Sequence, residues 1–316
     1  MEKKTSSTSP VRLIEIGPEQ QGQRIDNFLI KTLKSVPRTR VYRIIRKGEV
    51  RVNKKRVKPE YKLCLGDSVR VPPVRSEGSE HDEVTLPGDL VALIEKSILF
   101  ENESIVIVNK PAGLAVHSGS GVRFGLIDVM RQLRANSPIE LVHRLDRDTS
   151  GCVMLAKGRE ALLSMQSLLR SDELRKHYIA IVKGHWPVKL TQIDSRLKRV
   201  TMPNGEKRVF VDPAGQSAET LIESVVHGKR GELLFSQVEI LLKTGRTHQI
   251  RVHCQSVGHS IGGDAKYGDR DFDRLLRHAG CKRLLLHADR LELPQTAHTQ
   301  AIEVVAPRPA EFDLLA

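Results

Sequence analysis

The chain has 316 residues, of which 39% are hydrophobic, and its net charge is +13. That share of apolar residues is enough for a packed core and excludes a largely disordered chain. No apolar run reaches the roughly 20 residues that span a bilayer, and residues 1–10 lack the apolar stretch of a secretory signal. The four cysteines lack the paired spacing of zinc or redox sites, so we expect buried thiols and a cytoplasmic protein.

The positive charge is concentrated near the N-terminus. Residues 24–75 contain 16 Lys and Arg but 4 Asp and Glu. The rest of the chain contains 35 Lys and Arg and 34 Asp and Glu. A solvated basic surface is the ordinary explanation of such a stretch, but its concentration beside a nearly neutral remainder favours a polyanion-binding module. Nucleic acid is favoured over membrane, because no amphipathic segment pairs this charge with large exposed apolar residues.

The basic segment has the pattern of a small folded domain. Residues 23–33 follow the spacing of a short amphipathic helix. Pro37 suits the first turn of a second helix, which Gly48 can end. Short strands are expected at residues 50–52 and 65–71. Two helices and a small sheet therefore make up a compact module.

Phosphate contact and shape should dominate RNA binding by this module, because few polar aromatic residues are available for stacking. The side chains expected to contact RNA lie along one face of the second helix and in the following turn: Arg40, Arg43, Lys47, Lys54 and Lys55. The chain then divides into a flexible N-terminus at residues 1–21, the basic module at 22–74, a linker at 75–89, and a large domain at 90–316.

The large domain alternates short apolar runs with loops. Strands are expected at residues 105–108, 152–155, 178–182 and 235–242. Helical spacing recurs at residues 159–170 and 272–279. Because helices are too few and irregular for a doubly wound parallel sheet, we expect an α+β fold. Loops around a cleft are expected at residues 109–117, 262–268 and 284–288.

The densest polar cluster is LVHRLDRDTSG at residues 141–151, in which two arginines flank Asp146. A carboxylate between guanidinium groups stays ionised and can act as a nucleophile or base. The alternative is a surface loop of alternating charges. Metal binding by His143, Asp146 and Asp148 is a weaker alternative, since the arginines would compete with a cation.

A second cluster is TGRTHQIRVH at residues 244–253. Thr247 can cap a helix that runs to Val257. A zinc site is not expected, because His248 and His253 diverge on a helix and fall on opposite faces of a strand. Arg246, just before the cap, could reach into a site or simply bind a phosphate at the surface. The residues alone thus indicate an RNA-binding protein with an arginine-framed carboxylate.

These blocks resemble a known family. HRLDRDTSG at residues 143–151 is similar to the signature of the RluA-type pseudouridine synthases. Residues 109–113, 176–178, 245–253 and 263–268 match the other blocks of that family in order. The basic module resembles the RNA-binding domain named after ribosomal protein S4. Together the likeness covers nearly everything from residue 22 to about residue 307.

The resemblance implies a mainly antiparallel mixed sheet with flanking helices and conversion of uridine to pseudouridine without a cofactor or metal. Segments such as residues 22–29 and 267–274 resemble members that modify several uridines of 23S ribosomal RNA. The implied partner is that RNA or a large-subunit assembly intermediate, with no membrane, and we expect a monomer.

The resemblance also assigns roles to individual residues. Asp146 would be the catalytic carboxylate, acting either by attacking the sugar or by removing a ribose proton. Tyr178 would pack on the uracil ring and assist proton removal at carbon 5, and Arg144 would hold open the space left by the flipped nucleotide. Arg246 would pair with Asp146, with Arg251 as a nearby rival.

Two other functions remain open. One is a non-catalytic RNA-binding or ribosome-assembly factor with a decayed synthase domain. Retention of Asp146, Tyr178 and Arg246 together argues against it. The other is an RNA-binding hydrolase using His143 and Asp146, which lacks a convincing nucleophile or metal set.

Overall fold

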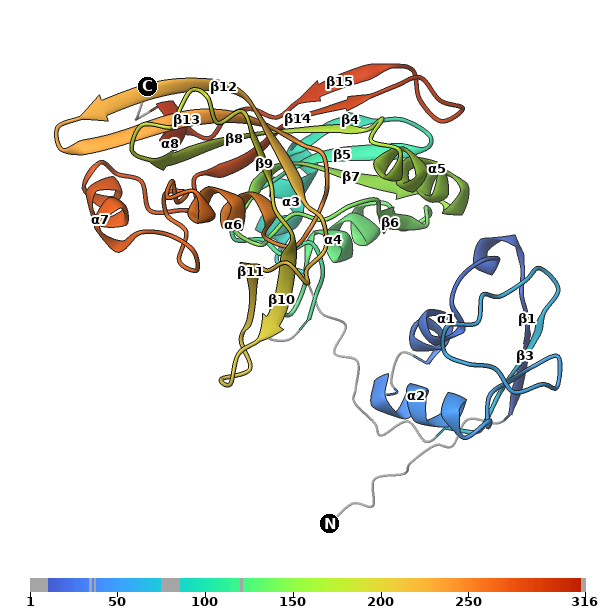
Figure 1. The fold of residues 1–316 in the computed structure, drawn as a ribbon. Coiled ribbons are helices and arrows are strands. Elements are labelled where there is room, and N and C mark those ends of the chain that lie inside the picture. Colours follow the sequence, from blue (N-terminus) through green and yellow to red (C-terminus); the bar gives the residue numbers. More distant parts are fainter. Residues whose placement is uncertain (1–10, 34–35, 37, 75–85, 120–121, 314–316) are drawn as a thin grey trace, which may run out of the picture. The chain divides into compact units, whose positions relative to one another are not determined.

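A computed structural model describes the chain except for residues 1–10, 34–35, 37, 75–85, 120–121 and 314–316. It divides into two compact units, Met1–Thr85 and Leu86–Ala316, which are taken in turn below (Figure 1). Pro37 and residues 75–85 of the expected linker lie outside the described residues. The last residues of that linker begin a helix, α3 (Gly88–Lys96).

A three-stranded antiparallel sheet and two helices form the first unit. The strands pair in the order β1-β3-β2, where β1 is Arg12–Glu15, β2 is Arg51–Val52 and β3 is Ser68–Val71. The helices are α1 (Ile25–Thr32) and α2 (Arg38–Arg46), and a short 3-10 helix, η1 (Pro18–Gln20), precedes them. Apolar faces of both helices pack against the sheet in one core. The two helices and two strands expected in this module are confirmed.

Strand β1 was not expected. Residues 1–21 are predicted to be flexible, but residues 12–15 pair with β3, and Ile16 is 1% exposed. The backbone N–H of Ile16 donates to the carbonyl of Asp67 at 2.9 Å. The strand is short and has one partly buried apolar residue, Ile14, so its local pattern is weak. Its partner strand, β3, is more than fifty residues away, so local periodicity does not reveal the pairing.

The basic side chains of the first unit lie where they were expected. Gly48, with φ +74°, ends α2, and its N–H donates to the carbonyl of Ile45. Arg43 and Lys47 are exposed at this end of the helix, and Arg40 is half-buried. The following turn carries Lys54 and Lys55, both exposed. A row of cations therefore faces solvent without entering the core.

A ten-stranded mixed sheet is the centre of the second unit. Its strands run in the order β4-β5-β7-β14-β8-β13-β12-β9, with β15 beside β14 and β6 beside β7. All pairs are antiparallel except β7 and β14. The strands are β4 (Ile98–Glu101), β5 (Ile105–Lys110), β6 (Ile139–Leu141), β7 (Ser150–Lys157), β8 (Arg175–Lys183), β9 (Gln192–Asp194), β12 (Glu219–Arg230), β13 (Leu233–Leu242), β14 (Leu286–Leu293) and β15 (Ile302–Val305).

Helices cover both faces of this sheet. Alternate residues of its strands pack with α3, α4 (Leu126–Leu133) and α6 (Gln249–Ser256) in one core. The intervening residues pack with α5 (Arg159–Arg170) in a second core, and with α7 (Arg270–His278) and α8 (Ala310–Asp313) in a third. The α+β class, the four expected strands and the two expected helices are confirmed. Among the described residues, no helix is both long and apolar enough to cross a membrane.

Two features of the second unit differ from the expected pattern. Residues 286–288, predicted to be part of a loop, begin β14, because they pair with β7 and β8 at the middle of the sheet. Strands β10 (Leu197–Thr201) and β11 (Lys207–Val211) form a separate two-stranded sheet. Figure 1 shows this hairpin projecting from the body of the unit.

Candidate active site

The loop that carries Asp146 connects β6 to β7 and is fixed where β7 begins. There β7 runs parallel to β14, with Gly151 opposite Ala288. Gly151 has φ +107°, and a side chain at this position would collide with the Ala288 carbonyl. The glycine thus allows the two strands to approach at the root of the loop, which fixes where Asp146 can lie.

A buried lysine anchors the same loop from β5. Lys110 is 0% exposed, and its Nζ donates to the carbonyls of Pro111, Leu114 and Arg147 at 2.8–3.0 Å. Because Arg147 follows Asp146 directly, this contact ties the loop at residues 109–117 to the loop of the carboxylate. The loop at residues 109–117, expected beside a cleft, thus supports the loop of Asp146, but none of its residues lines the pocket around Asp146.

Asp146 faces a guanidinium group on α6. Its Oδ2 accepts a hydrogen bond from Arg251 Nη1 at 2.9 Å. The other nitrogens of Arg251, Nε and Nη2, donate to both carboxylate oxygens of Asp264 at 2.7 and 2.8 Å. Asp264 has a side chain only 1% exposed, and it also accepts the backbone N–H groups of Lys266 and Tyr267. Arg251 is thus held from behind and directed at Asp146.

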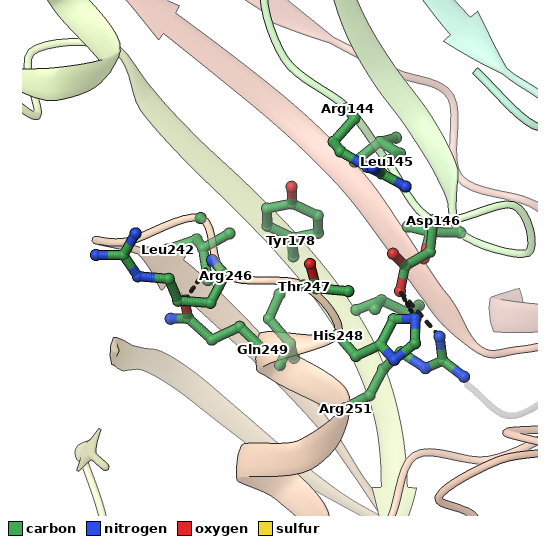
Figure 2. A pocket seen from close by; sticks show the side chains of 14 residues that line it. Arg144, Leu145, Asp146, Tyr178, Leu242, Arg246, Thr247, His248, Gln249 and Arg251 are labelled. Carbon is green, nitrogen blue, oxygen red and sulfur yellow. Dashed lines mark hydrogen bonds and ion pairs between the residues drawn. The ribbon is translucent and has the colours of Figure 1, made fainter. Parts of the chain in front are cut away.

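The prediction that Arg246 pairs with Asp146 is wrong. Arg246 is exposed, its Nε donates to the carbonyl of Ser217 at 3.0 Å, and Figure 2 shows its guanidinium directed away from Asp146. The physical reason is the start of α6. This helix begins at Gln249, so Arg251 lies in its first turn, whereas Arg246 lies in the preceding loop.

The expected cap of this helix is also wrong. The N-cap residue is His248, not Thr247, and it has a left-handed backbone with φ +54°. Thr247 is exposed and lines the pocket instead. His248 Nδ1 lies 2.8 Å from the hydroxyl of Tyr267, and its Nε2 lies 3.9 Å from Asp146 Oδ2. The left-handed turn therefore directs an imidazole, rather than a capping hydroxyl, toward the carboxylate.

Tyr178 lies on β8, on the sheet face that packs against α6. The residue is 6% exposed, and burial, with the charge of Asp146 as a smaller cause, raises the pKa of its hydroxyl. The phenol is therefore protonated at neutral pH. Figure 2 shows the ring between Arg144 and the loop of Thr247.

One pocket brings together the four site residues that were predicted in the large domain. Asp146, Tyr178, Arg144 and Arg246 all line it, together with Thr247, His248 and Arg251 (Figure 2). Arg144 is exposed, whereas Asp146 has a side chain 19% exposed. The basic residues predicted in the N-terminal module belong to the other unit and are not part of this pocket.

Charge in the pocket is set by burial and by the carboxylates around Arg251. Burial alone would lower the pKa of Arg251, but hydrogen bonding and charge from Asp264, with Asp146, raise it above its ordinary value. Burial would likewise raise the pKa of Asp264, yet its bonds to Arg251 hold it below the usual range. Burial lowers the pKa of His248, which favours the neutral imidazole. Arg251 and Asp264 are therefore both ionised, and the imidazole of His248 is neutral.

The alternatives based on His143 gain no support. His143 Nε2 accepts the backbone N–H of Met154 at 3.1 Å, and the residue does not line the pocket. Desolvation lowers the pKa of this half-buried histidine to about 3. Within the described part of the chain, no group of three or more His, Cys, Asp or Glu side chains is arranged to hold a metal ion.

Sequence reasoning missed the residues behind Arg251. Asp264 and Tyr267 fall in a predicted loop, but nothing in their spacing connects them to Asp146. The sequence indicates Arg251 only as a rival of Arg246. The helical phase could have found it, because a helix starting at Gln249 places Arg251 in its first turn, near the carboxylate.

Comparison with known proteins places these residues in a family. Residues 104–256 match the family described as RNA pseudouridylate synthase, and residues 23–69 match the S4 domain. The ribosomal large subunit pseudouridine synthase C of Yersinia pestis is 47% identical over 93% of this chain and 91% of its own. The protein of the same name from Escherichia coli strain K12 is 44% identical over 96% of this chain and 94% of its own.

Two solved structures share the fold of the second unit. Human RNA pseudouridylate synthase domain containing 4 has a TM-score of 0.57 and 26% identity, over 72% of this chain and 94% of its own. Human RNA pseudouridylate synthase domain containing 1 has a TM-score of 0.55 and 25% identity, over 67% of this chain and 83% of its own.

Proposed function

The chain belongs to the RNA pseudouridylate synthase family, and on that premise we propose that it converts specific uridines of large-subunit (23S) ribosomal RNA to pseudouridine, with Asp146 as the catalytic carboxylate. The RNA target rests on the relatives from Yersinia pestis and Escherichia coli, whose names give a ribosomal large subunit function. The match extends over more than nine-tenths of this chain and includes the S4 domain.

The observation that carries the assignment is the way in which Asp146 is held. Its contacts with Arg251 and His248 both involve Oδ2, and in the described residues no partner is bound to Oδ1. One oxygen is therefore fixed, and Figure 2 shows the carboxylate directed into the pocket. A carboxylate with one oxygen held and the other free suits attack on a sugar carbon or removal of a proton.

The reaction is an isomerisation, so no atom is gained or lost overall. The bond between N1 of uracil and C1′ of ribose breaks, the base turns, and a bond between C5 and C1′ forms. The proton on C5 leaves, and N1 ends the reaction carrying a proton. Asp146 would start this sequence by attacking C1′ or by removing the proton on C2′, and neither route needs a cofactor.

Tyr178 would pack against the uracil ring. Stacking of a base on an aromatic side chain contributes roughly 1–3 kcal/mol. Because its pKa is raised, the phenol is a hydrogen-bond donor at neutral pH rather than a base. Tyr178 would therefore assist proton removal at C5 by holding the uracil ring in place and by donating a hydrogen bond.

The arginines of the pocket would have separate tasks. Arg251 would orient Asp146 through its contact at 2.9 Å. Exposed Arg144 would occupy the stack after the nucleotide has flipped into the pocket. Arg246, which does not contact Asp146, would bind the RNA backbone at the edge of the pocket.

The experiment is to incubate the purified protein with a 23S ribosomal RNA transcript and to analyse the nucleosides. We expect pseudouridine with the native protein and none with Asp146→Asn. Mapping pseudouridines in ribosomal RNA from cells with and without the protein then gives the positions. RNA binding without any pseudouridine, on transcript and on assembly intermediates alike, would instead support a non-catalytic assembly factor.

A further inference from the structure

The β10–β11 hairpin is an arm that attaches to the second unit through one of its two faces. Leu197 and Val209 are buried with Tyr267 and Val252 of the body. The N–H of Val209 donates to the Tyr267 hydroxyl at 2.9 Å, and Lys266 Nζ donates to the carbonyl of Lys207. The inner face of the arm is therefore docked.

The outer face of the arm is basic and aromatic. Because side chains alternate along a strand, the register pairs Lys198 with Phe210 and Val200 with Arg208 on the face opposite Val209. Phe210 is 41% exposed, and it is the only exposed one of the seven phenylalanines, all of which the structure describes. Residues 196–212 contain five Lys and Arg but two acidic residues, Glu206 and Asp212. Lys198 pairs with Asp212 at 3.1 Å, and this exposed ion pair can exchange its carboxylate for a phosphate.

This composition fits a single-stranded nucleic acid. An exposed ring can stack on any base, and neighbouring cations can contact phosphates. A groove beside the arm is lined by Lys198 of the outer face and by Arg199 of the opposite face. It also includes Arg246 and Thr247, which line the pocket of Asp146. An RNA strand whose uridine occupies the pocket can therefore continue along the arm.

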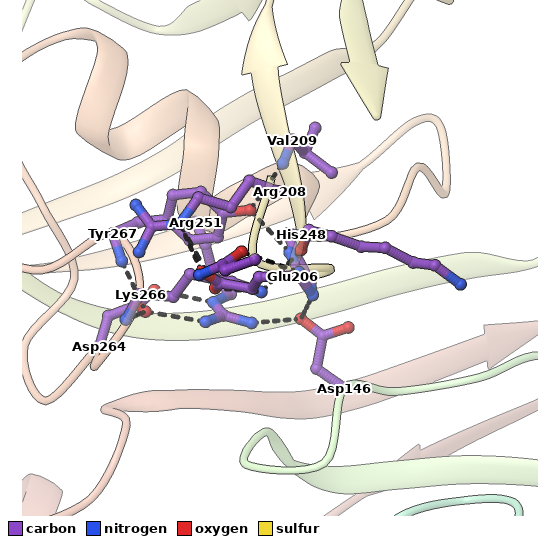
Figure 3. A network of polar contacts seen from close by, with 11 residues as sticks. Asp146, Glu206, Arg208, Val209, His248, Arg251, Asp264, Lys266 and Tyr267 are labelled. Atoms are coloured by element: carbon purple, nitrogen blue, oxygen red, sulfur yellow. Dashed lines mark hydrogen bonds and ion pairs between the residues drawn. The ribbon is translucent and has the colours of Figure 1, made fainter. Parts of the chain in front are cut away.

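The face of the arm that packs on the body is connected to Asp146 through Tyr267 and His248. The Tyr267 hydroxyl accepts the N–H of Val209 and lies 2.8 Å from His248 Nδ1 (Figure 3). Since the hydroxyl has one proton, we assign it as the donor to Nδ1. His248 then carries its proton on Nε2, the nitrogen 3.9 Å from Asp146.

Tyr267 also contacts the second group that faces Asp146. The guanidinium carbon of Arg251 lies 5.1 Å from the centre of the Tyr267 ring, and the His248 ring meets that ring edge-on. One side chain therefore joins the backbone of β11 to both side chains that contact Asp146. A shift of the arm would therefore move Tyr267 and, with it, the two side chains that contact Asp146.

We propose, on the basis of the function proposed above, that the outer face of the β10–β11 hairpin binds the single-stranded RNA beside the target uridine, and that Tyr267 and His248 are positioning residues that transmit this contact to Asp146. The arm would thus contribute to affinity through Phe210 and Lys198 and to the rate through Tyr267.

The first test measures binding of a ribosomal RNA fragment to the full chain. Phe210→Ala should raise the Kd about 5- to 100-fold, as expected for one lost stacking contact. Lys198→Ala should reduce the slope of log affinity against log salt by about 0.7. Leu163→Ala, at an exposed position of α5, is the matched control and should leave both values unchanged.

The second test separates rate from affinity under single-turnover conditions with saturating protein. Tyr267→Phe keeps the ring on Arg251 but removes the link to Val209 and His248, so the rate constant should fall about tenfold with little change in Kd. Ser236→Ala is the control, because this buried hydroxyl also accepts one N–H and donates to a carbonyl, far from the pocket. It should lower stability to a similar extent and leave the rate constant unchanged.

The coupling itself is tested by combining variants. Phe210→Ala should also lower the saturated rate constant, and this effect should disappear in the Tyr267→Phe background. His248→Asn, which tolerates the left-handed backbone and keeps an acceptor for Tyr267, should lower the rate constant as Tyr267→Phe does.

Native affinity of the Phe210 and Lys198 variants would overturn the RNA contact. If the rate constant of the double variant fell by the product of the two single reductions, Phe210→Ala and Tyr267→Phe would act independently, and the coupling would be overturned. Failure of the proposed function is a different result, in which the native protein forms no pseudouridine although the binding measurements still report on the arm.

Discussion

Arg251 donates to Asp146 from the one guanidinium nitrogen that Asp264 leaves unbound. Nη1 lies 2.9 Å from Asp146 Oδ2, while Nε and Nη2 bind the two oxygens of Asp264. A planar guanidinium held on one edge cannot rotate, so its third nitrogen points in a fixed direction. The buried carboxylate of Asp264 therefore fixes the direction in which Arg251 Nη1 points, and with it the position in which Asp146 faces a substrate.

Asp146→Asn should abolish pseudouridine formation and leave RNA affinity within about twofold. Asparagine has the same shape but can neither attack C1′ nor accept a proton, and losing a negative charge does not weaken RNA binding. Nucleoside analysis and a binding titration on one preparation measure both quantities. Pseudouridine formed by this variant would exclude Asp146 as the catalytic carboxylate.

Arg251→Lys should lower the rate constant about 10- to 100-fold, because charge-assisted hydrogen bonds worth roughly 1.5–3 kcal/mol are lost. A lysine keeps the charge but cannot bind Asp264 at two points and reach Asp146 as well. Arg246→Lys is the matched control, and it should affect the Kd for RNA more than the saturated rate constant. The reverse pattern in single-turnover kinetics would restore Arg246 as the partner of the carboxylate.

The site could be predicted where contiguous residues carry it. Asp146 and Arg144 lie in one nine-residue block that resembles the family signature, and Tyr178 lies in another matching block. The structure places all three side chains at one pocket. The prediction that Arg246 pairs with Asp146 failed because Arg246 lies in the loop before α6, whereas Arg251 lies in its first turn. The start of the helix depends on the left-handed turn at His248, which the sequence pattern did not reveal.

In the fold, too, elements that local sequence determines could be predicted, whereas those that depend on distant partners could not. The amphipathic helix at residues 159–170 was found with its observed ends, because local periodicity determines it. The β1 strand and the role of residues 286–288 in β14 depend on partners far away in sequence. The bond from Tyr267 to Val209 likewise joins residues 58 positions apart, so spacing could not reveal that the hairpin is attached there.

Tyr178→Phe should slow turnover more than it weakens binding. The phenylalanine ring still stacks on uracil, whereas the donor hydroxyl is gone, so the Kd should remain within about twofold. Tyr178→Leu removes the stacking as well and should raise the Kd by about fivefold or more. Turnover at the native rate by Tyr178→Phe would restrict the residue to packing.

Stability at acid pH should depend on Glu101. Hydrogen bonds from Arg134 and a contact with Lys157 lower the pKa of Glu101 to about 2 in the folded protein, below its usual value of 4.5. The unfolded chain therefore takes up the proton first as the pH falls. The stabilisation is complete above pH 4.5 and disappears as the pH falls toward 2.

Glu101→Gln tests this dependence. At pH 7 the variant should be less stable by about 1–2 kcal/mol, a value reduced for partial exposure to solvent. The difference from the native protein should shrink as the pH falls from 4.5 to 2. Denaturant unfolding at a series of pH values measures it, and a difference independent of pH would contradict the ion-pair explanation.

The last prediction concerns the cations of the N-terminal unit. Arg43 and Lys47 at the end of α2 and Lys54 in the following turn are exposed. If they contact phosphates without reading bases, the triple alanine variant of the full chain should lose most affinity at low salt, and the loss should shrink as the salt concentration rises. Each lost contact reduces the slope of log affinity against log salt by about 0.7–0.9, so three contacts should reduce it by about 2–3.

The rate constant at saturating protein should stay at its native value in this variant, because Asp146, Tyr178 and Arg251 belong to the other unit. Alanine at three exposed cations of the second unit away from the pocket, Arg170, Lys189 and Lys229, provides a control of equal charge. If both triple variants reduced the slope equally, net charge alone would explain the effect. An unchanged slope in the first variant would mean that these side chains do not touch RNA, and protein contacts on the assembling ribosome would then become the better explanation of the basic module.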